Sequence, residues 1–139
     1  MYDGKPILLI EDERASGPTV RAALGELGVS HGVVHVSNAE EALAFLRAEA
    51  PQMPSIIFLD GSREETSGLD VLRAVKHDEK LKSIPVITLA PSGDAKIINQ
   101  SFELGAAGYV VKSDNHKDFV EAVRAVHQYW MLSEVPVGA

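Results

Sequence analysis

The sequence predicts an α/β fold in which a parallel sheet is covered by helices on both faces. Strand-like apolar segments alternate five times with amphipathic helical segments along the 139 residues. The apolar segments 7–10 and 56–59 are uninterrupted, which is typical of strands buried on both faces. Right-handed crossovers between parallel strands then place helices on both sides of the sheet. The length suits one domain with a proper core, which we assign to residues 1–133, followed by a tail at 134–139.

Three of the five predicted strands end in charged residues. Glu11 and Asp12 follow the first strand, Asp60 ends the third, and Lys112 closes the fifth. Pro85 stands at the start of the fourth, where a proline is tolerated. The five strands are predicted at residues 5–10, 31–36, 55–60, 84–90 and 107–111.

Capping residues and glycines set the predicted helix ends. Pro18 fits the first turn of the first helix, and Gly28 ends that helix. Asn38 is the predicted N-cap of the second helix, which runs to about Ala48 with Glu41 in capping-box position. The third helix follows Ser67 and carries Leu69, Leu72 and Val75, the fourth lies between Gly93 and Gly105, and the fifth runs from about Asp114 to Leu132.

Composition excludes several classes of protein. The net charge of −7 argues against a general nucleic-acid binder, which needs a basic face. The chain has no cysteine, and therefore no disulfide framework and no cysteine zinc site. No apolar run reaches the ~18 residues of a membrane span, and the N-terminus lacks a signal-peptide pattern. We expect a cytoplasmic protein that acts without nucleic acid or membrane.

The charged residues at the strand ends form the candidate site. Because parallel strands carry their ligand sites beyond their carboxyl ends, Glu11, Asp12, Asp60 and Lys112 are expected to converge there. Two or three carboxylates can hold Mg²⁺ through oxygen. A metal and a lysine together would neutralise a phosphoryl group under attack by an aspartate. Taken alone, Asp60 would favour the interpretation as a strand-ending residue that caps the next turn.

The same residues carry a resemblance to a known family. The chain resembles the receiver domains of two-component response regulators over nearly its full length. The matching motifs are Ile7–Asp12, Leu59–Asp60 with Gly68 eight residues later, Ile84–Val86 and Gly105–Lys112. Segments 41–47, 102–106 and 119–130 look like the small single-domain regulators that partner bacterial and cyanobacterial phytochromes.

The resemblance implies a flavodoxin-like (βα)5 domain with strand order 2-1-3-4-5. It also implies that Asp60 is the phosphoacceptor, that Asp12, Asp60 and the Ser62 backbone carbonyl bind Mg²⁺, and that Glu11 acts largely through water. Lys112 would contact the phosphoryl group. The implied partners are a sensor histidine kinase and a downstream protein or phosphotransfer partner.

The sequence departs from the family pattern at the switch. Ala90 stands where the family has a Ser or Thr whose hydroxyl bonds the phosphoryl group. Tyr109 keeps the family's aromatic switch position without that partner. Ser113 replaces the proline after Lys112, and the loop 61–67 lacks the family's apolar residues and proline. We expect phosphorylation with atypical switching.

The apolar stripe on the last predicted helix indicates a surface that binds a partner. Helical spacing places Phe119, Val123 and Trp130 on one apolar stripe. Neighbouring apolar residues make this stripe wider than a helix needs to pack against the core, and surplus apolar surface suggests a partner. With Ile97 of the fourth helix, these residues are the predicted interface of a homodimer. The alternative is a broad docking face against the sheet and the fourth helix.

Three functions are considered for a chain with these residues. The first is a phosphoacceptor module that is not an enzyme, although it assists its own phosphorylation and dephosphorylation, and that signals by protein contact or phosphorelay. The second is a receiver-like interaction or dimerisation module that works without phosphorylation, favoured by Ala90 and Ser113. The third is a haloacid-dehalogenase-like hydrolase, which would need a second aspartate where Ser62 stands.

Overall fold

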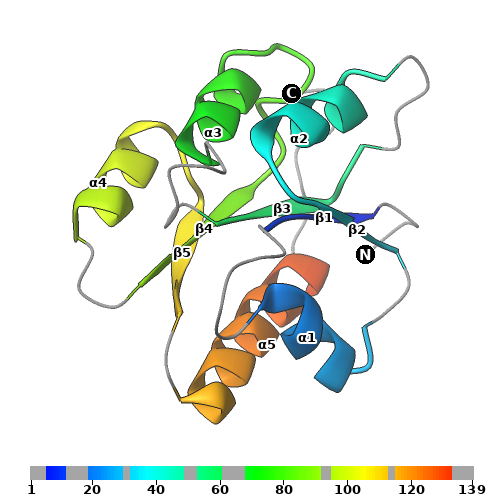
Figure 1. Cartoon of the computed structure of the whole chain (residues 1–139), viewed down its shortest axis with the longest axis vertical. Coiled ribbons are helices and arrows are strands. Elements are labelled where there is room, and N and C mark those ends of the chain that lie inside the picture. The colour runs from blue at the N-terminus through cyan, green and yellow to red at the C-terminus, as the bar shows by residue number, and fades with distance from the viewer. Residues whose placement is uncertain are drawn as a thin grey trace.

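Five parallel strands form the single sheet of the described part of the chain. The structure is a computed structural model that describes residues 6–11, 19–29, 32–48, 53–60, 68–91, 95–112 and 115–132. The strands are β1 (Ile7–Ile10), β2 (Val33–Val36), β3 (Ile56–Asp60), β4 (Val86–Pro91) and β5 (Gly108–Lys112). Their order is β2-β1-β3-β4-β5, and every neighbouring pair is parallel (Figure 1). The predicted fold class and strand order are confirmed.

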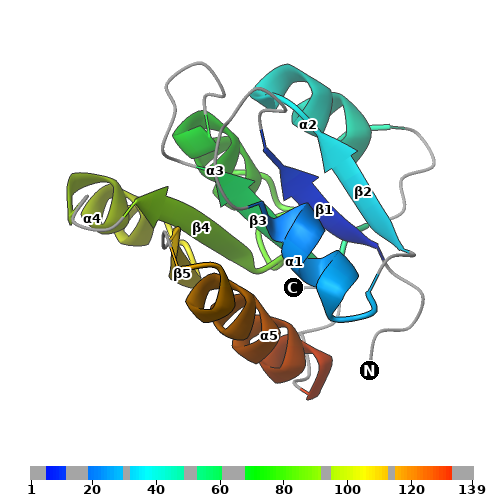
Figure 2. The same ribbon diagram turned by 60° about the horizontal axis from the view of Figure 1, so that its bottom comes forward.

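Helices cover both faces of the sheet. The first helix, α1 (Val20–Glu26), and the last, α5 (His116–Leu132), lie side by side on one face (Figures 1 and 2). The other face carries α2 (Ala39–Leu46), α3 (Gly68–Lys76) and α4 (Ala95–Glu103). No helix in the described part of the chain is long and apolar enough to cross a membrane.

The strands supply both faces with core residues because successive side chains point to opposite sides. Ile7 and Leu9 pack with α1 and α5, whereas Leu8 and Ile10 pack with α2 and α3. Residues Ile56–Leu59 divide in the same way and are all buried. This double burial explains why the strands appear in the sequence as unbroken apolar runs.

Helix ends follow local hydrogen-bonding rules. Asn38 caps α2 as predicted, since its Oδ1 accepts the Glu41 N–H at 2.9 Å, while the Glu41 carboxylate accepts the Ser37 N–H. The N-cap of α1 is Thr19, whose hydroxyl accepts the Ala22 N–H. The prediction that Pro18 lies in the first turn was therefore wrong: α1 begins at Val20, and Pro18 itself lies outside the described residues.

The predicted interface on α5 needs correction. Phe119 and Val123 are fully buried and pack with β-strand residues and α1. Because no part of these side chains reaches the surface, they cannot contact a partner without unfolding. The stripe was wide because α5 packs against both the sheet and α1. Ile97 is half-buried on α4, and the side chain of Trp130 lies outside the described part.

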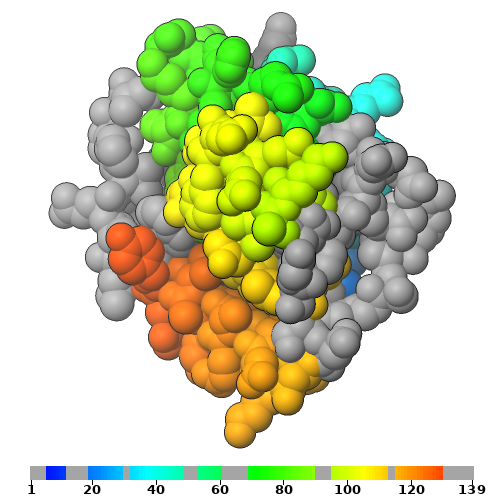
Figure 3. All heavy atoms as spheres, turned by 90° about the vertical axis from the view of Figure 1, so that its left-hand side faces the viewer, coloured from blue at the N-terminus to red at the C-terminus, as the bar shows by residue number. Residues whose placement is uncertain are grey.

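Helix α4 is the least embedded helix on its face. Ser101 is its fully buried residue, and the Ser101 hydroxyl donates to the Ile97 carbonyl at 2.8 Å. Phe102 on α4 is 47% exposed. Figure 3 shows α4 standing out at the surface between α3 and α5. The Phe102 side chain therefore reaches the surface.

Candidate functional site

Asp60 and Lys112 meet at the carboxyl ends of β3 and β5. The Lys112 Nζ donates to Asp60 Oδ2 at 3.1 Å. The Asp60 side chain is fully buried, and that of Lys112 is 11% exposed. Strand β4 lies between their strands, with Asp60 beside Leu89 and Lys112 beside Pro91. The predicted convergence of these two residues is present although they stand 52 positions apart.

Glu11 joins the end of β1 to helix α1. Its carboxylate accepts the N–H of Val20 at 2.9 Å and that of Arg21 at 3.5 Å. Burial raises the pKa of the Glu11 carboxyl above its ordinary value, while the Val20 N–H and the charge of Lys112 oppose that rise. The helix N-terminus suits a carboxylate because its backbone N–H groups lack intrahelical partners. Glu11 therefore caps α1 from the neighbouring strand.

The backbone of Glu11 is held as firmly as its side chain. Its N–H donates to the Val36 carbonyl at 3.1 Å, which continues the β1–β2 pairing. The Glu11 carbonyl lies 2.8 Å from the His35 Nε2. Because a carbonyl only accepts, that nitrogen must carry the proton. Sequence reasoning missed His35, although a polar residue next to the end of an otherwise apolar strand was a signal that could have found it.

Several predicted site residues cannot be placed. Asp12, Ser62 and Ser113 lie outside the described residues, as does the loop 61–67. Ala90 belongs to β4 and pairs with Val111, but its side chain is not described. Their predicted roles stay predictions.

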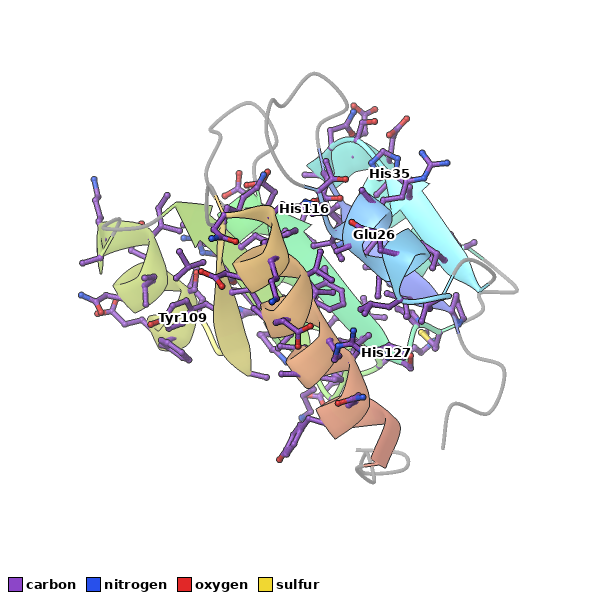
Figure 4. The ribbon with its side chains drawn as sticks, turned by 90° about the horizontal axis from the view of Figure 1, so that it is seen from below. Glu26, His35, Tyr109, His116 and His127 are labelled. Carbon is purple, nitrogen blue, oxygen red and sulfur yellow. The ribbon has the colours of Figure 1, made fainter. Side chains whose placement is uncertain are left out.

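Thr88 and Tyr109 lie beside each other on β4 and β5. Thr88 is fully buried, as expected of a core residue, and its hydroxyl is a buried polar atom without a hydrogen-bond partner in the structure described. Tyr109 is 42% exposed, and its ring packs edge-on against Phe102 with centroids 5.8 Å apart. Tyr109 thus sits at the border of β5 and α4 (Figure 4).

The donors that are described suit a hard cation. Asp60 and Glu11 are both buried, near enough to influence each other's charge, and Lys112 is the ammonium close to them. An excess of buried carboxyl oxygen over ammonium is the arrangement that a divalent cation neutralises. Within the described ranges no three acidic or histidine side chains form a metal-binding group, so a complete site needs donors such as Asp12.

Comparison with known proteins decides the family. Residues 7–124 match the response regulator receiver domain. The chain belongs to this family. It is 31% identical over 131 residues to response regulator Rcp1 of Synechocystis sp., which covers 91% of this chain and 89% of Rcp1.

Solved receiver structures show the same fold. The Mn²⁺-bound form of Rcp1 superposes with a TM-score of 0.80 at 29% identity, covering 96% of this chain and 99% of that one. The bacteriophytochrome response regulator RtBRR gives 0.68 at 35% identity, covering 96% and 85%. The phosphorylated cyanobacterial phytochrome response regulator RcpA gives 0.78 at 31%, covering 95% and 98%. This receiver domain is thus related to phytochrome response regulators, as its sequence suggested.

Proposed function

We propose that this receiver domain accepts a phosphoryl group on Asp60 from the phosphohistidine of a histidine kinase. The observation that carries the proposal is the buried contact between the Lys112 Nζ and Asp60 Oδ2. A lysine at that oxygen stabilises the carboxylate before transfer and lies next to the phosphoryl oxygens after it. The relationship to phytochrome regulators favours a phytochrome-type kinase as the donor.

The transfer needs one nucleophile and one leaving group. A carboxylate oxygen of Asp60 forms the new bond to phosphorus while the bond from phosphorus to the kinase imidazole breaks. The electron pair of that bond leaves with the imidazole nitrogen, which then takes a proton. Lys112 offsets the negative charge on the phosphoryl oxygens. The chain acts as a phosphoacceptor that assists its own phosphorylation and dephosphorylation.

Mg²⁺ is the cofactor that we propose for this transfer. When bound, it neutralises charge on the phosphoryl oxygens. Asp60 would hold it by a carboxylate oxygen, Asp12 by its carboxylate and Ser62 by its backbone carbonyl. Glu11 would act through water, since its own oxygens already accept N–H groups of α1.

The test is phosphorylation of the whole chain by acetyl phosphate and Mg²⁺, read on a Phos-tag gel and located by mass spectrometry. Wild type should shift, and Asp60→Asn should not. Asp70→Asn is the matched control, because Asp70 is an exposed aspartate on α3 that pairs with Arg73. Equal labelling of Asp60→Asn and wild type would refute Asp60 as the acceptor.

We further propose that phosphorylation and switching are separable here. In the family a hydroxyl at the position of Ala90 bonds the phosphoryl group, and such charge-assisted bonds contribute ~1.5–3 kcal/mol. A ligand shifts a conformational equilibrium only by its differential affinity for the two states. Without the hydroxyl, beryllofluoride with Mg²⁺ should move NMR resonances near Asp60 and leave Tyr109 nearly unmoved. Shifts at Tyr109 as large as those of Ala90→Thr would defeat this proposal.

We propose that the homodimer forms through a different surface from the one predicted from the sequence. Among the described side chains of α4, β5 and α5, three large apolar ones are exposed: Phe102, Tyr109 and Tyr129. A specific dimer should bury over ~1,000 Å² in total. Light scattering at tens of micromolar protein should show a dimer, with and without beryllofluoride. Phe102→Ser with Tyr129→Ser should give a monomer that is still labelled on Asp60, and a wild-type monomer would exclude the dimer.

A second function is an interaction module that works without phosphorylation. The replacement of the switch hydroxyl by Ala90 favours it. It predicts that Asp60→Asn binds the downstream protein or phosphotransfer partner as well as wild type does. The same phosphorylation experiment separates the two functions, because the interaction module needs no label at Asp60.

A further inference from the structure

Glu11 is held by hydrogen bonds to two other elements of the fold, β2 and α1. Its N–H donates to β2 at Val36, and its carboxylate accepts two N–H groups from α1. Its carbonyl is contacted at 2.8 Å by the imidazole of His35, also on β2. The main-chain pairing of β1 and β2 ends with Ile10 beside Val36. The His35 side chain therefore adds one hydrogen bond just beyond the end of the strand ladder.

That carbonyl belongs to the peptide group that joins Glu11 to Asp12. Because the peptide group is planar, a hydrogen bond to the Glu11 carbonyl restricts rotation of the whole group. We propose that His35 is a positioning residue that holds the Glu11 carbonyl at the end of β1 and thereby supports Mg²⁺ binding at the phosphorylation site. This inference rests on the proposed function.

The side chain of His35 is suited to this task. It projects from β2 at the end of the sheet next to β1 (Figure 4). Nε2 carries a proton in the imidazolium and in one neutral tautomer, and either form donates to the Glu11 carbonyl. The carboxylate of Glu11 cannot hold the peptide by itself, because its bonds to α1 fix the side chain and leave the carbonyl to other donors. Partners that orient metal ligands typically affect metal affinity strongly when removed.

Two variants test the hydrogen bond from His35 to the Glu11 carbonyl. His35→Phe keeps a ring of similar size and removes the donor, whereas His35→Gln offers an amide N–H at about the reach of Nε2. His77→Phe is the matched control, because His77 is exposed just after α3 and donates its backbone N–H within that helix end. All four proteins are compared as full chains at one fixed neutral pH.

The first measurement needs no metal. In ¹³C- and ¹⁵N-labelled protein, the carbonyl resonance of Glu11 should shift in His35→Phe and should stay close to wild type in His35→Gln and His77→Phe. The second measurement is Mg²⁺ titration followed by amide NMR shifts. Binding should weaken on the order of three- to tenfold in His35→Phe, with rescue to within about twofold in His35→Gln.

The labelling rate supplies a third readout. With acetyl phosphate, His35→Phe should be slow at limiting Mg²⁺ and approach the wild-type rate at saturating Mg²⁺, because the variant loses metal affinity and keeps Asp60 and Lys112. Equal Mg²⁺ affinity in wild type and His35→Phe, or an unchanged Glu11 carbonyl resonance, would overturn the role of His35 alone. Wild type that binds no Mg²⁺ would overturn both this role and the proposed function.

Discussion

The buried hydroxyl of Thr88 should make the protein less stable than it could be. Thr88 is fully buried on β4, and its Oγ1 has no hydrogen-bond partner in the described structure. A buried hydroxyl without a partner costs ~1–3 kcal/mol relative to its hydration in the unfolded chain. Valine replaces the hydroxyl by a methyl group of nearly the same shape and keeps the β-branch that suits a strand. We expect Thr88→Val to raise the free energy of unfolding by about 1–2 kcal/mol.

Urea unfolding followed by circular dichroism measures this change. With a slope of about 1–3 kcal/mol per molar urea for a domain of this size, the midpoint should rise by roughly 0.5–1 M at an unchanged slope. Thr88→Ser is the control, because it keeps the hydroxyl and loses a buried methyl group, which should cost about 1 kcal/mol. If Thr88→Val proved no more stable than wild type, the hydroxyl would have a partner, and the reasoning would be refuted.

Three further changes have defined outcomes. Gly105→Ala should lower the free energy of unfolding by about 1–2 kcal/mol in urea, since Gly105 has φ +100 and an added Cβ would lie 3.1 Å from Lys76 Cγ; a neutral result would contradict the contact. Thr19→Ala should cost about 1 kcal/mol by removing the N-cap bond to Ala22, and Thr19→Ser should recover most of it. Burial raises the folded-state pKa of Glu11 above its ordinary 4.5, so the folded chain binds the proton more tightly than the unfolded chain does. In Mg²⁺-free urea titrations, wild-type stability relative to Glu11→Gln should therefore fall as the pH rises above about 4.5, and a relative rise would contradict the direction of the shift.

The fold could be predicted because its signals are local. Unbroken apolar strands such as Ile56–Leu59 indicate burial on both faces, and Asn38 with Glu41 marks a helix start through bonds within one turn. The start of α1 was misjudged because two residues, Pro18 and Thr19, both suit a helix start. The sequence does not show which of them the tertiary structure uses.

Surface and core could not be separated on α5 from sequence alone. The stripe containing Phe119 and Val123 is wide because α5 packs against α1 as well as against the sheet, and contact between these distant segments leaves no periodic signal. On α4 the polar Ser101 takes the buried position, whereas the side chain of Phe102 is exposed. Hydrophobic periodicity shows which residues of a helix share a face, and it does not show which other elements pack against that face.

The phosphorylation site and Tyr109 lie on opposite faces of the sheet, which gives a physical reason to expect phosphorylation without a large conformational change. Asp60 follows Phe58 by two positions and Lys112 follows Val110 by two, and both Phe58 and Val110 pack on the α1–α5 side. Tyr109 neighbours Val110 and therefore points to the opposite side, where it meets Phe102 of α4. A change at Asp60 must pass from one face to the other to reach Tyr109. The hydroxyl that the family places at the end of β4 would provide a polar link at this crossing, and Ala90 cannot make it. The polar contacts described at these strand ends join Lys112 to Asp60 and Glu11 to α1 and β2, and none of them reaches α4. We therefore expect phosphorylation of Asp60 to act at the strand ends with little movement of α4.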